Sequence, residues 1–573
     1  MTEKTSELSN FLADVSSRKR TMLLPALHLA QDLYGWISTE TQKEISEELR
    51  VPLADIHGVI EFYTMFYNKP TAKKVIRVCD GPACEIKNAH AVLEASERRL
   101  GIKTGENTDD LEVSFEHVPC LGMCEFAPVG LNGLEAAGEL SSQNVNEFLD
   151  GKLSQPAVNV FGDQLSMLSR VGTVDPNDLE SYEGAGGFDG LREVLKQDPE
   201  DVINLVESFN ILGRGGAQFP TGSKWRITRN TENAKNEKHI VVNADESEPG
   251  TFKDRVLMEE DPFSVIEAAI LAGFAVGAEN GWIFVRGEYP RSFQRLENAI
   301  HQARSKGYLG KNIFDIEGLN FDIEIRKGAG AYICGEETAL FEAIEGKRGF
   351  PRMKPPFPTT HGLFNQPTVV NNVETLAAVL SAINMGSEVW NGLGTDQSPG
   401  TKLFCISGNV EKAGLYEYPF GQSIGELIEM AGGVPQDKEI QGILLGGAAG
   451  VFIGPDKLDV KLTYEDAKEH GIPIGSGVIM VFDEDVEMMP ILNNLARFFA
   501  HESCGKCFPC QLGTQRQMEI LTMNGDKKLL SRSDKIDLAD IGFAMTETSI
   551  CGLGQTASTA VQSAIKLWPE LVE

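Results

Sequence analysis

The sequence contains no hydrophobic run long enough to cross a membrane. Its most apolar long segment, SVIEAAILAGFAVGA at 264–278, is shorter than the roughly 20 residues that span a bilayer and contains Glu267. This segment is expected to form a buried helix. The opening residues, MTEKTSELSN, also lack the cationic start and apolar core of a signal peptide. These absences predict a cytoplasmic chain without direct membrane insertion.

Positive charge is also scarce. The chain has 52 lysines and arginines against 83 aspartates and glutamates, a formal net charge of -31, and no polybasic run. A surface of this sign repels phosphate backbones and anionic lipids, which argues against nucleic acid or electrostatic membrane binding. It favours protein partners that carry the opposite charge. Internal repeats and low-complexity tracts are absent as well.

A chain of 573 residues, 42% of them hydrophobic, exceeds the size of one hydrophobic core and predicts three or more domains. Apolar residues recur at helical spacing near both ends, whereas strands such as 239–245 and 281–289 alternate with helices in the middle. The predicted fold class is multidomain α/β. The expected segments are a helical region at 1–70, a small α/β unit at 71–150, an interdomain linker at 151–190, an α/β nucleotide-binding domain at 191–398, a β-grasp-like domain at 399–486 and a helical domain at 487–573.

A first group of cysteines follows two predicted strands. Cytosolic cysteines are kept reduced, so clusters among the ten here are interpreted first as metal or redox sites. Cys79 and Cys84 form a C-x4-C pair, and Cys120 and Cys124 a C-x3-C pair. If the two strands are neighbours whose carboxyl ends meet, the four thiolates can hold a [2Fe-2S] cluster. A zinc site and unconnected buried cysteines are the alternatives.

A second group lies in ESCGKCFPCQLGT at 502–514, where Cys504, Cys507 and Cys510 form C-x2-C-x2-C. A cubane cluster needs four ligands, and Cys551 is the remaining cysteine within the same helical segment. The four predict a [4Fe-4S] cluster. Zinc remains an alternative at this stage.

Two motifs in the central domain suit a nucleotide. ILGRGGAQFPTGSKW at 211–225 is rich in glycines, which allow close backbone approach to phosphate, and Lys224 can supply the counter-charge. Asn243, Asp245, Glu246 and Glu248 directly follow a predicted strand, where ligands bind in open α/β sheets. The structural alternatives are a tight turn and a solvated acidic loop.

Further candidates follow in sequence. Gly335, Glu336 and Glu337 open a predicted helix, whose amino-terminal N–H groups favour anions. Phe357 can stack on a purine, and the paired amides that follow can bind a phosphate or a flavin edge; they are Asn371 and Asn372. Taken singly, each of these motifs favours ordinary packing or turn formation over a binding role.

Together these motifs resemble one known family. GRGGAQFPTGSKW, NADESEPGTFKDR, GAYICGEETAL, PPFP, VNNVET, SCGKCFPC and SICGLG match, in this order, the flavoprotein subunit of the NADH-oxidising module of respiratory complex I and its relatives in soluble NAD-linked hydrogenases and formate dehydrogenases. The match covers about 190–573. Residues 20–150 resemble the thioredoxin-like [2Fe-2S] subunit of the same module, so the chain looks like a fusion of the two.

The resemblance implies a thioredoxin-like [2Fe-2S] domain, a Rossmann-like FMN and NADH domain, a ubiquitin-like β-grasp domain and a helical [4Fe-4S] domain. Glu246 and Glu248 would lie near the nicotinamide and ribose of NADH, and Phe219 and Phe357 around its adenine. Glu337 belongs to the same implied cofactor-binding set. The residues implied to hold FMN are Gly213, Arg214, Gly215, Lys224, Asn243, Asp245, Tyr332, Gly335, Glu336, Asn371, Asn372 and Thr375.

Two positions depart from the family pattern. Gln218 replaces a glycine, and Ile227 replaces an aromatic residue two positions after Trp225. The second change is expected to remove one wall of the adenine stack and to weaken NADH affinity.

The implied activity is that of an NADH dehydrogenase, or diaphorase, in which NADH reduces FMN and single electrons leave through iron–sulfur clusters. The implied partner is an iron–sulfur acceptor subunit of a larger complex, which could hold the chain at the inner face of a membrane. The same module working in reverse would reduce NAD in a hydrogenase or formate dehydrogenase. A non-catalytic zinc-bound scaffold is a further alternative. The terminal acceptor, the direction of hydride flow and the oligomeric state do not follow from the sequence.

Overall fold

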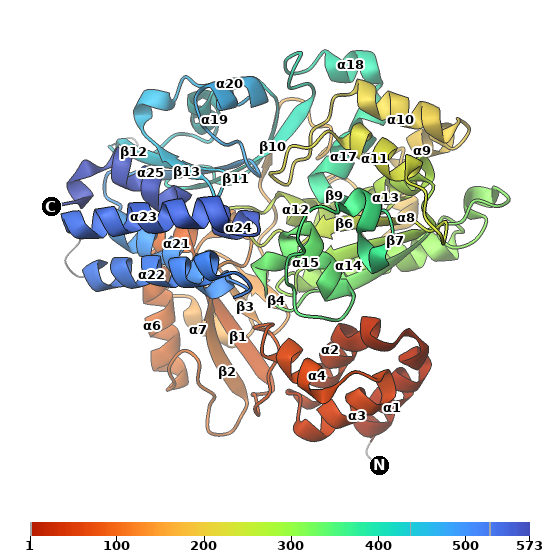
Figure 1. Ribbon diagram of the computed structural model, residues 1–573. Helices are drawn as coiled ribbons and strands as arrows, with labels where there is room; N and C mark the ends of the chain where they lie inside the picture. Colours follow the sequence, from red (N-terminus) through yellow and green to blue (C-terminus); the bar gives the residue numbers. More distant parts are fainter. Residues whose placement is uncertain (1–2, 436, 526–528) are drawn as a thin grey trace.

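The structure, a computed structural model, describes residues 3–435, 437–525 and 529–573 (Figure 1). Within these ranges no helix has both the length and the apolarity needed to cross a membrane. Figure 1 shows the red amino-terminal helices below the green central α/β domain. The blue carboxy-terminal helices lie beside the orange sheet, which precedes the central domain in the chain.

The amino-terminal region is helical, as predicted. Apolar residues at helical spacing, among them Leu23, Leu27 and Ala30, are fully buried. The region is attached to the central domain by main-chain bonds such as that from the Met65 N–H to the Ala329 oxygen (2.9 Å). Its helices are α1 (Glu3–Val15), the 3-10 helix η1 (Ser16–Met22), α2 (Leu23–Tyr34), α3 (Thr39–Leu49) and α4 (Leu53–Ile60).

A small α/β unit follows, and both strands predicted before the cysteine pairs are present. Its sheet has the order β2-β1-β3-β4, with β1 parallel to β2 and antiparallel to β3. The predicted helix ends at Gly101, which takes a left-handed φ of 71°. The elements are β1 (Lys74–Cys79), α5 (Pro82–Ile86), α6 (Ala89–Leu100), β2 (Val113–Val118), η2 (Cys124–Phe126), β3 (Gly130–Asn132), β4 (Glu135–Ala137) and α7 (Val145–Leu149).

The segment expected to be a linker is built into the domains that it connects. It contains β5 (Val160–Phe161), α8 (Leu179–Gly184) and α9 (Asp189–Val194). Met167 and Leu168 are buried, and their N–H groups donate to the buried carboxylate of Glu417 at 3.1 and 3.0 Å. Because its partners lie about 250 positions away in sequence, local periodicity gives little sign of this structure.

The central domain contains a parallel four-stranded sheet of order β8-β7-β6-β9. Its strands are β6 (His239–Ala244), β7 (Asn280–Val285), β8 (Asp322–Lys327) and β9 (Thr368–Asn372). Its helices are α10 (Pro199–Ser208), α11 (Thr221–Asn230), α12 (Lys253–Glu260), α13 (Pro262–Val276), α14 (Pro290–Ser305), η3 (Ile313–Asp315), η4 (Tyr332–Gly335), α15 (Glu337–Ile344), α16 (Pro358–His361), η5 (Leu363–Asn365), α17 (Val373–Met385) and α18 (Ser387–Asn391).

The predicted buried helix is α13, and all but one of its residues are buried. Its single acid, Glu267, accepts hydrogen bonds from the Tyr182 hydroxyl (2.5 Å) and the Phe188 N–H (2.9 Å). These bonds offset the cost of placing a carboxyl group in an apolar core.

The order of the central strands creates a topological switch point. The chain runs outward from β6 through β7 to β8 and then returns to the opposite side of β6 with β9. In open α/β sheets, ligands bind beyond the carboxyl ends of strands at such a point. Asn243 and Asn372 face each other in register there.

The next unit contains a six-stranded mixed sheet of order β13-β12-β14-β10-β11-β5. The predicted strand, turn, strand and helix are β10, β11 and α19, and the predicted strand at the end of this unit is β14. The elements are β10 (Thr401–Gly408), β11 (Gly414–Pro419), α19 (Ile424–Met430), β12 (Ile440–Leu445), β13 (Val451–Ile453), η6 (Pro455–Lys457), α20 (Tyr464–Glu469) and β14 (Val478–Asp483).

The chain ends in a helical unit, as predicted. A turn between its first two long helices carries Cys504 and Cys507, and Cys551 immediately precedes α24. The helices are α21 (Met488–Glu502), α22 (Phe508–Gly525), α23 (Arg532–Thr548), α24 (Gly552–Thr556), α25 (Thr559–Leu567) and η7 (Pro569–Leu571).

Candidate redox and nucleotide site

The first cysteine group lies at the carboxyl edge of the small sheet. Because β1 and β2 are parallel neighbours, the loops after them meet and bring the four thiols together. The sulfurs of Cys120 and Cys124 are 3.9 Å apart, and Cys79 lies within hydrogen-bonding reach of Cys84 and Cys120. All four thiols are buried. Four soft ligands in one buried loop pair fit a [2Fe-2S] cluster.

The surroundings of Cys120 favour the thiolate that iron binds. The pKa of Cys120 is lowered well below its usual value because the thiols of Cys124 and Cys79 donate to its sulfur, with a smaller contribution from the positive charge of Arg286. The Gly122 N–H also donates to this sulfur, at 3.3 Å.

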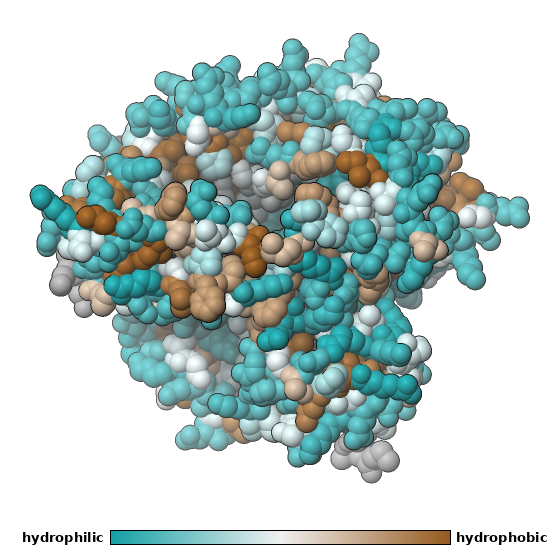
Figure 2. Space-filling view, in the orientation of Figure 1, coloured by the Kyte–Doolittle hydropathy of each residue, from teal (hydrophilic) through white to brown (hydrophobic). Residues whose placement is uncertain are grey.

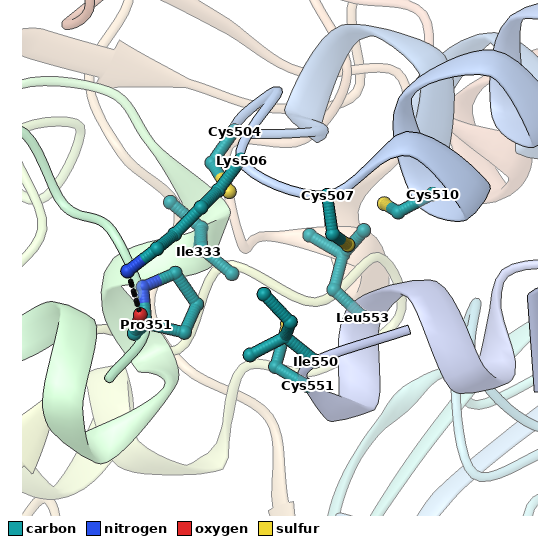
Figure 3. A pocket seen from close by; sticks show the side chains of 9 residues that line it. All are labelled: Ile333, Pro351, Cys504, Lys506, Cys507, Cys510, Ile550, Cys551 and Leu553. Carbon is teal, nitrogen blue, oxygen red and sulfur yellow. Dashed lines mark hydrogen bonds between the residues drawn. The ribbon is translucent and has the colours of Figure 1, made fainter. Parts of the chain in front are cut away.

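The second cysteine group lines one cavity (Figure 3). Cys504, Cys507, Cys510 and Cys551 line one pocket with five further residues, which are Ile333, Pro351, Lys506, Ile550 and Leu553. Within the described ranges, no three His, Cys, Asp or Glu side chains are grouped as a binding site for a single ion. The four thiols instead stand on the wall of a space between two domains. Four cysteines around one pocket are a ligand set that fits a [4Fe-4S] cluster.

The cavity is closed on one side by the central domain. Lys506 donates from Nζ to the main-chain oxygen of Pro351 at 2.6 Å, the dashed line in Figure 3. Ile333, from η4, stands on the same side. The cysteine turn is therefore joined directly to the domain that contains the switch point.

At the switch point, the glycine-rich loop approaches the end of β9. A Cβ atom on Gly215 would stand 3.2 Å from the Cβ of Asn372, so a side chain there would crowd this approach. Gln218 in the same loop has a φ of 53°, a left-handed conformation that glycine adopts without steric cost. The structure thus accounts for the glycine that the family pattern has at this position.

Asp245 follows β6 and faces the same crevice. Its Oδ2 is buried without a hydrogen-bond partner among the described residues, and Gly335 packs so closely that a Cβ there would lie 3.2 Å from it. Burial raises the pKa of Asp245 to about 8, against the opposing charge of Arg286. A buried carboxyl oxygen without a partner fits a polar ligand edge with ring N–H and C=O groups, as flavin has.

Lys224 lies near the end of the same glycine-rich motif, on α11. Burial lowers its pKa, and its Nζ donates to the Val370 oxygen at 2.9 Å, beside the ring of Phe219. A partly buried lysine with free donor positions can bind a phosphate by donating hydrogen bonds to it. Phe219 and Phe357 are both exposed, at the outer side of the domain.

The amino terminus of α15 is already capped by the chain. Glu336 accepts from the Thr338 and Ala339 N–H groups at 3.0 and 2.9 Å. Lys354 bridges Glu336 and Glu337 at 2.9 and 2.6 Å. The Glu336 carboxylate therefore occupies the place at this helix terminus where the sequence predicts a bound anion.

Several other candidates take part in internal bonds. The Oδ1 of Asn371 accepts from the Trp225 indole at 2.9 Å, and Asn243 donates to the Gly335 oxygen at 2.8 Å. Thr375 accepts from the main-chain N–H of Arg214 at 2.9 Å. The Arg214 side chain itself is buried against Glu374. These residues shape the crevice whether or not they touch a ligand.

Glu246 and Glu248 have separate surroundings. Glu246 accepts from the Asp254 and Arg255 N–H groups at 2.7 and 2.8 Å and so caps α12. Burial raises its pKa to about 8. Burial raises the pKa of Glu248 to about 7. Its carboxylate accepts hydrogen bonds from the Ala449 N–H (2.7 Å) and the Tyr332 hydroxyl (3.2 Å).

Sequence reasoning missed the residues that connect these parts. Arg286 donates from Nη1 to the Glu246 oxygen (3.0 Å) and from Nη2 to the Cys120 oxygen (2.8 Å). Glu502 accepts from the Tyr332 N–H at 2.8 Å, just before the second cysteine group. Both lie close in sequence to recognisable motifs, but only the fold shows what they contact.

Four family models match consecutive parts of the chain. They are a thioredoxin-like [2Fe-2S] ferredoxin at 8–152, a Nuo51 FMN-binding domain at 206–381, an SLBB domain at 403–448 and an NADH-ubiquinone oxidoreductase-F iron–sulfur binding region at 490–573. The two iron–sulfur descriptions support [2Fe-2S] and [4Fe-4S] clusters, and not zinc, as the cofactors of these two regions.

Two relatives and one solved structure extend the match. The F 2 subunit of the NADH-quinone oxidoreductase of Rhizobium meliloti is 41% identical over 70% of this chain and 94% of its own. NAD-reducing hydrogenase HoxS subunit alpha of Cupriavidus necator is 33% identical over 97% of this chain and 92% of its own. The structure of an NAD+-reducing [NiFe]-hydrogenase in the H2-reduced state matches with a TM-score of 0.84 and 31% identity, over 97% of this chain and 94% of that one.

The fold and the site thus define a flavin- and iron–sulfur-dependent oxidoreductase subunit with a fused [2Fe-2S] domain. The expected fold class and cofactor set are confirmed by these matches. The chain belongs to the family that comprises the F subunits of NADH-quinone oxidoreductases and the related subunits of NAD-reducing hydrogenases.

Proposed function

We propose that the chain is the electron-input subunit of a larger complex. In this proposal it binds NADH beside FMN and delivers single electrons through its iron–sulfur clusters to a partner iron–sulfur subunit. The observation that supports this most directly is that hydrogen bonds join the switch-point crevice to both cysteine groups. Arg286 connects it to Cys120, and Tyr332 connects Glu248 to Glu502 beside Cys504.

FMN, when bound, would take a hydride from NADH and give up its electrons one at a time, which matches a two-electron donor to one-electron clusters. The residues of the chain orient it. Asp245 offers a buried carboxyl oxygen without a partner, Lys224 offers a cation for the phosphate, and the glycine-rich loop leaves room for close approach. The proposed FMN set is Gly213, Arg214, Gly215, Lys224, Asn243, Asp245, Tyr332, Gly335, Glu336, Asn371, Asn372 and Thr375.

NADH would enter from the outer side of the crevice. We assign Glu246 and Glu248 to its nicotinamide and ribose end, Phe219 and Phe357 to its adenine, and Glu337 to the wall between them. Phe219 and Phe357 are exposed aromatic side chains, which suits stacking on a base that arrives from solvent.

For the clusters, we assign Cys79, Cys84, Cys120 and Cys124 to [2Fe-2S] and Cys504, Cys507, Cys510 and Cys551 to [4Fe-4S]. The proposed domain boundaries are those expected from the sequence, with the segment at 151–190 treated as an ordered connection because β5 joins the sheet of the β-grasp unit. We also propose a cytoplasmic location, in which thiols stay reduced and partner subunits could hold the chain at a membrane. None of the ten cysteines forms a disulfide bond.

One experiment tests the proposal. Chain purified without oxygen should be yellow-brown, contain about six irons, and lose its flavin absorbance when NADH is added. A colourless protein that contains zinc would sink the proposal.

The reverse activity, NAD reduction within a hydrogenase-type complex, has one observation in its favour. The relative and the solved structure that match 97% of this chain, fused domain included, both carry names of NAD-reducing hydrogenases. Chain supplied with a reduced low-potential viologen should then form NADH from NAD+. Mass spectrometry of co-purified subunits would tell a hydrogenase from a quinone-reducing partner.

A further inference from the structure

A lysine of the β-grasp unit lies fully buried against the central domain. Lys402, near the start of β10, has no exposed side-chain surface. Its Nζ donates to both carboxylate oxygens of Glu374 at 2.9 and 2.7 Å and to the oxygens of Leu403 and Ser476. The Leu403 N–H adds a bond to the same carboxylate at 3.1 Å. The two domains are thus joined through one carboxylate.

Glu374 gathers two more cations from the central domain. Arg214 Nη1 and Lys253 Nζ each lie 3.2 Å from it, and all of these side chains are buried. Burial acts to raise the pKa of Glu374, but the three cations outweigh burial and hold it at about 2. Burial lowers the pKa of Lys402 to about 8, against the attraction of Glu374. The pair is therefore ionised at neutral pH.

This ionic cluster reaches the flavin crevice by two routes. Arg214 lies between Gly213 and Gly215 in the glycine-rich loop, and its side chain also donates to the Thr401 oxygen. Lys253 binds Asp254, which accepts from Asn372 at 2.6 Å at the end of β9. Both sides of the crevice are therefore held to the same carboxylate.

Burying charges in this way is costly, and apolar replacements of such clusters are often as stable. The position of this ionic cluster, between the β-grasp unit and the flavin crevice, indicates a role other than stability. Arg214 pairs with Glu374 directly, and Asn372 is connected to Glu374 through Asp254 and Lys253. Lys402 makes the shortest ion pair with that carboxylate.

We propose that Lys402 is a positioning residue by which the β-grasp unit fixes the glycine-rich loop of the flavin crevice through Glu374. The inference rests on the proposed function, because the ligand that the loop would hold is FMN. It assigns to the β-grasp unit a part in cofactor binding, although Lys402 itself lies behind the loop and not in the crevice.

Flavin affinity provides the test. The full chain, with both clusters intact, is freed of FMN and titrated with FMN by fluorescence quenching, as wild type and as Lys402→Met. We expect Lys402→Met to raise the Kd for FMN about tenfold, which corresponds to about 1.4 kcal/mol. Lys461→Met removes an exposed lysine of the same unit and should leave the Kd unchanged.

A double-mutant cycle separates positioning from general damage. In a Glu374→Gln background, Lys402→Met should change the Kd less than twofold, because its route to the loop is already gone. An equal effect in both backgrounds would show that Lys402 acts elsewhere. A Kd for Lys402→Met within twofold of wild type would also overturn the inference.

A measurement on wild type covers the case in which the variants fail to fold. Coupling is reciprocal, so FMN should slow hydrogen exchange at the Leu403 amide, which is bonded to Glu374. Unchanged hydrogen exchange at the Leu403 amide on FMN binding would contradict the proposal that Lys402 positions the loop through Glu374. Wild type that binds no FMN at all would instead contradict the proposed function itself.

Discussion

Arg286 donates a hydrogen bond to the main-chain oxygen of Cys120 at 2.8 Å, although the two residues belong to different domains. The same guanidinium binds the main-chain oxygen of Glu246 on its other side. Nearby, Tyr289 packs so tightly on Gly122 that a Cβ on that glycine would clash with the Tyr289 ring. One arginine therefore sets the [2Fe-2S] loop against the loop that follows β6.

Arg286→Met should loosen this junction. Arg286 is buried and paired with Glu288 at 3.0 Å, and removal of one partner of a buried ion pair costs about 3–5 kcal/mol. We expect a lower thermal unfolding temperature and iron content that falls from about six toward about four per chain as the [2Fe-2S] cluster is lost. Arg291→Met, at a partly exposed pair with Glu260, should cost no more than about 1 kcal/mol. Full iron retention in Arg286→Met would contradict this role.

Cys551→Ser tests the fourth ligand of the second cluster. Because Cys551 lines the same cavity as the C-x2-C-x2-C turn, its loss should remove the [4Fe-4S] cluster and leave about two irons per chain. NADH should still bleach the flavin, whereas reduction of downstream acceptors should fail. Cys405→Ser, which changes a buried cysteine in β10, is the matched control and should keep all the iron. Iron counts by plasma emission spectroscopy decide between the two outcomes.

Much of this site could be predicted from the sequence because its residues occur in short, ordered motifs. The two cysteine pairs follow apolar strands, so parallel pairing of β1 and β2 was enough to bring them together. Cys551 could be matched to the turn of Cys504 because it is the remaining cysteine of the helical segment. Asp245 follows β6 and Asn372 ends β9, and the carboxyl ends of these two strands meet at a switch point.

Other features depend on contacts between distant parts of the chain. Nothing local distinguishes Lys402 in β10 from an exposed strand lysine, and its burial follows only from docking against Glu374. Met167 and Leu168 lie in a stretch of weak periodicity, yet Glu417 anchors them. The sequence indicates an anion at the helix terminus opened by Gly335, Glu336 and Glu337, but the Glu336 carboxylate caps that helix itself. Such pairings are set by tertiary packing, which periodicity does not encode.

Glu248 should give NADH binding a pH dependence. Burial raises its pKa to about 7, and the ionised form is the better acceptor for ribose hydroxyls. We therefore expect kcat/KM for NADH to rise as pH increases from 6 to 8, with an inflection near 7 that disappears in Glu248→Gln. The sign for stability is the reverse. A folded-state pKa above that of the unfolded chain stabilises the fold most below about pH 4.3, and this contribution declines as pH rises through 7.

The control for this pH profile is Glu297→Gln, at an exposed glutamate of α14, which should keep the wild-type inflection. Rates are measured with an artificial electron acceptor so that no partner subunit is required. An inflection that survives in Glu248→Gln would assign the titration to another group of the crevice.

Ile227→Tyr should strengthen NADH binding. Ile227 is 43% exposed on α11, a helix that packs beside α16, which begins just after Phe357. Stacking of a base on an aromatic ring contributes about 1 kcal/mol or more, whereas isoleucine offers no such face. We expect the KM for NADH to fall about fivefold with kcat unchanged, since the adenine lies far from the reacting ring. Ile316→Tyr places the same side chain at another exposed isoleucine, after η3, and should leave KM unaltered. If both variants behave like wild type, the adenine does not stack beside α11, and the assignment of Phe357 to that stack would have to be withdrawn with it.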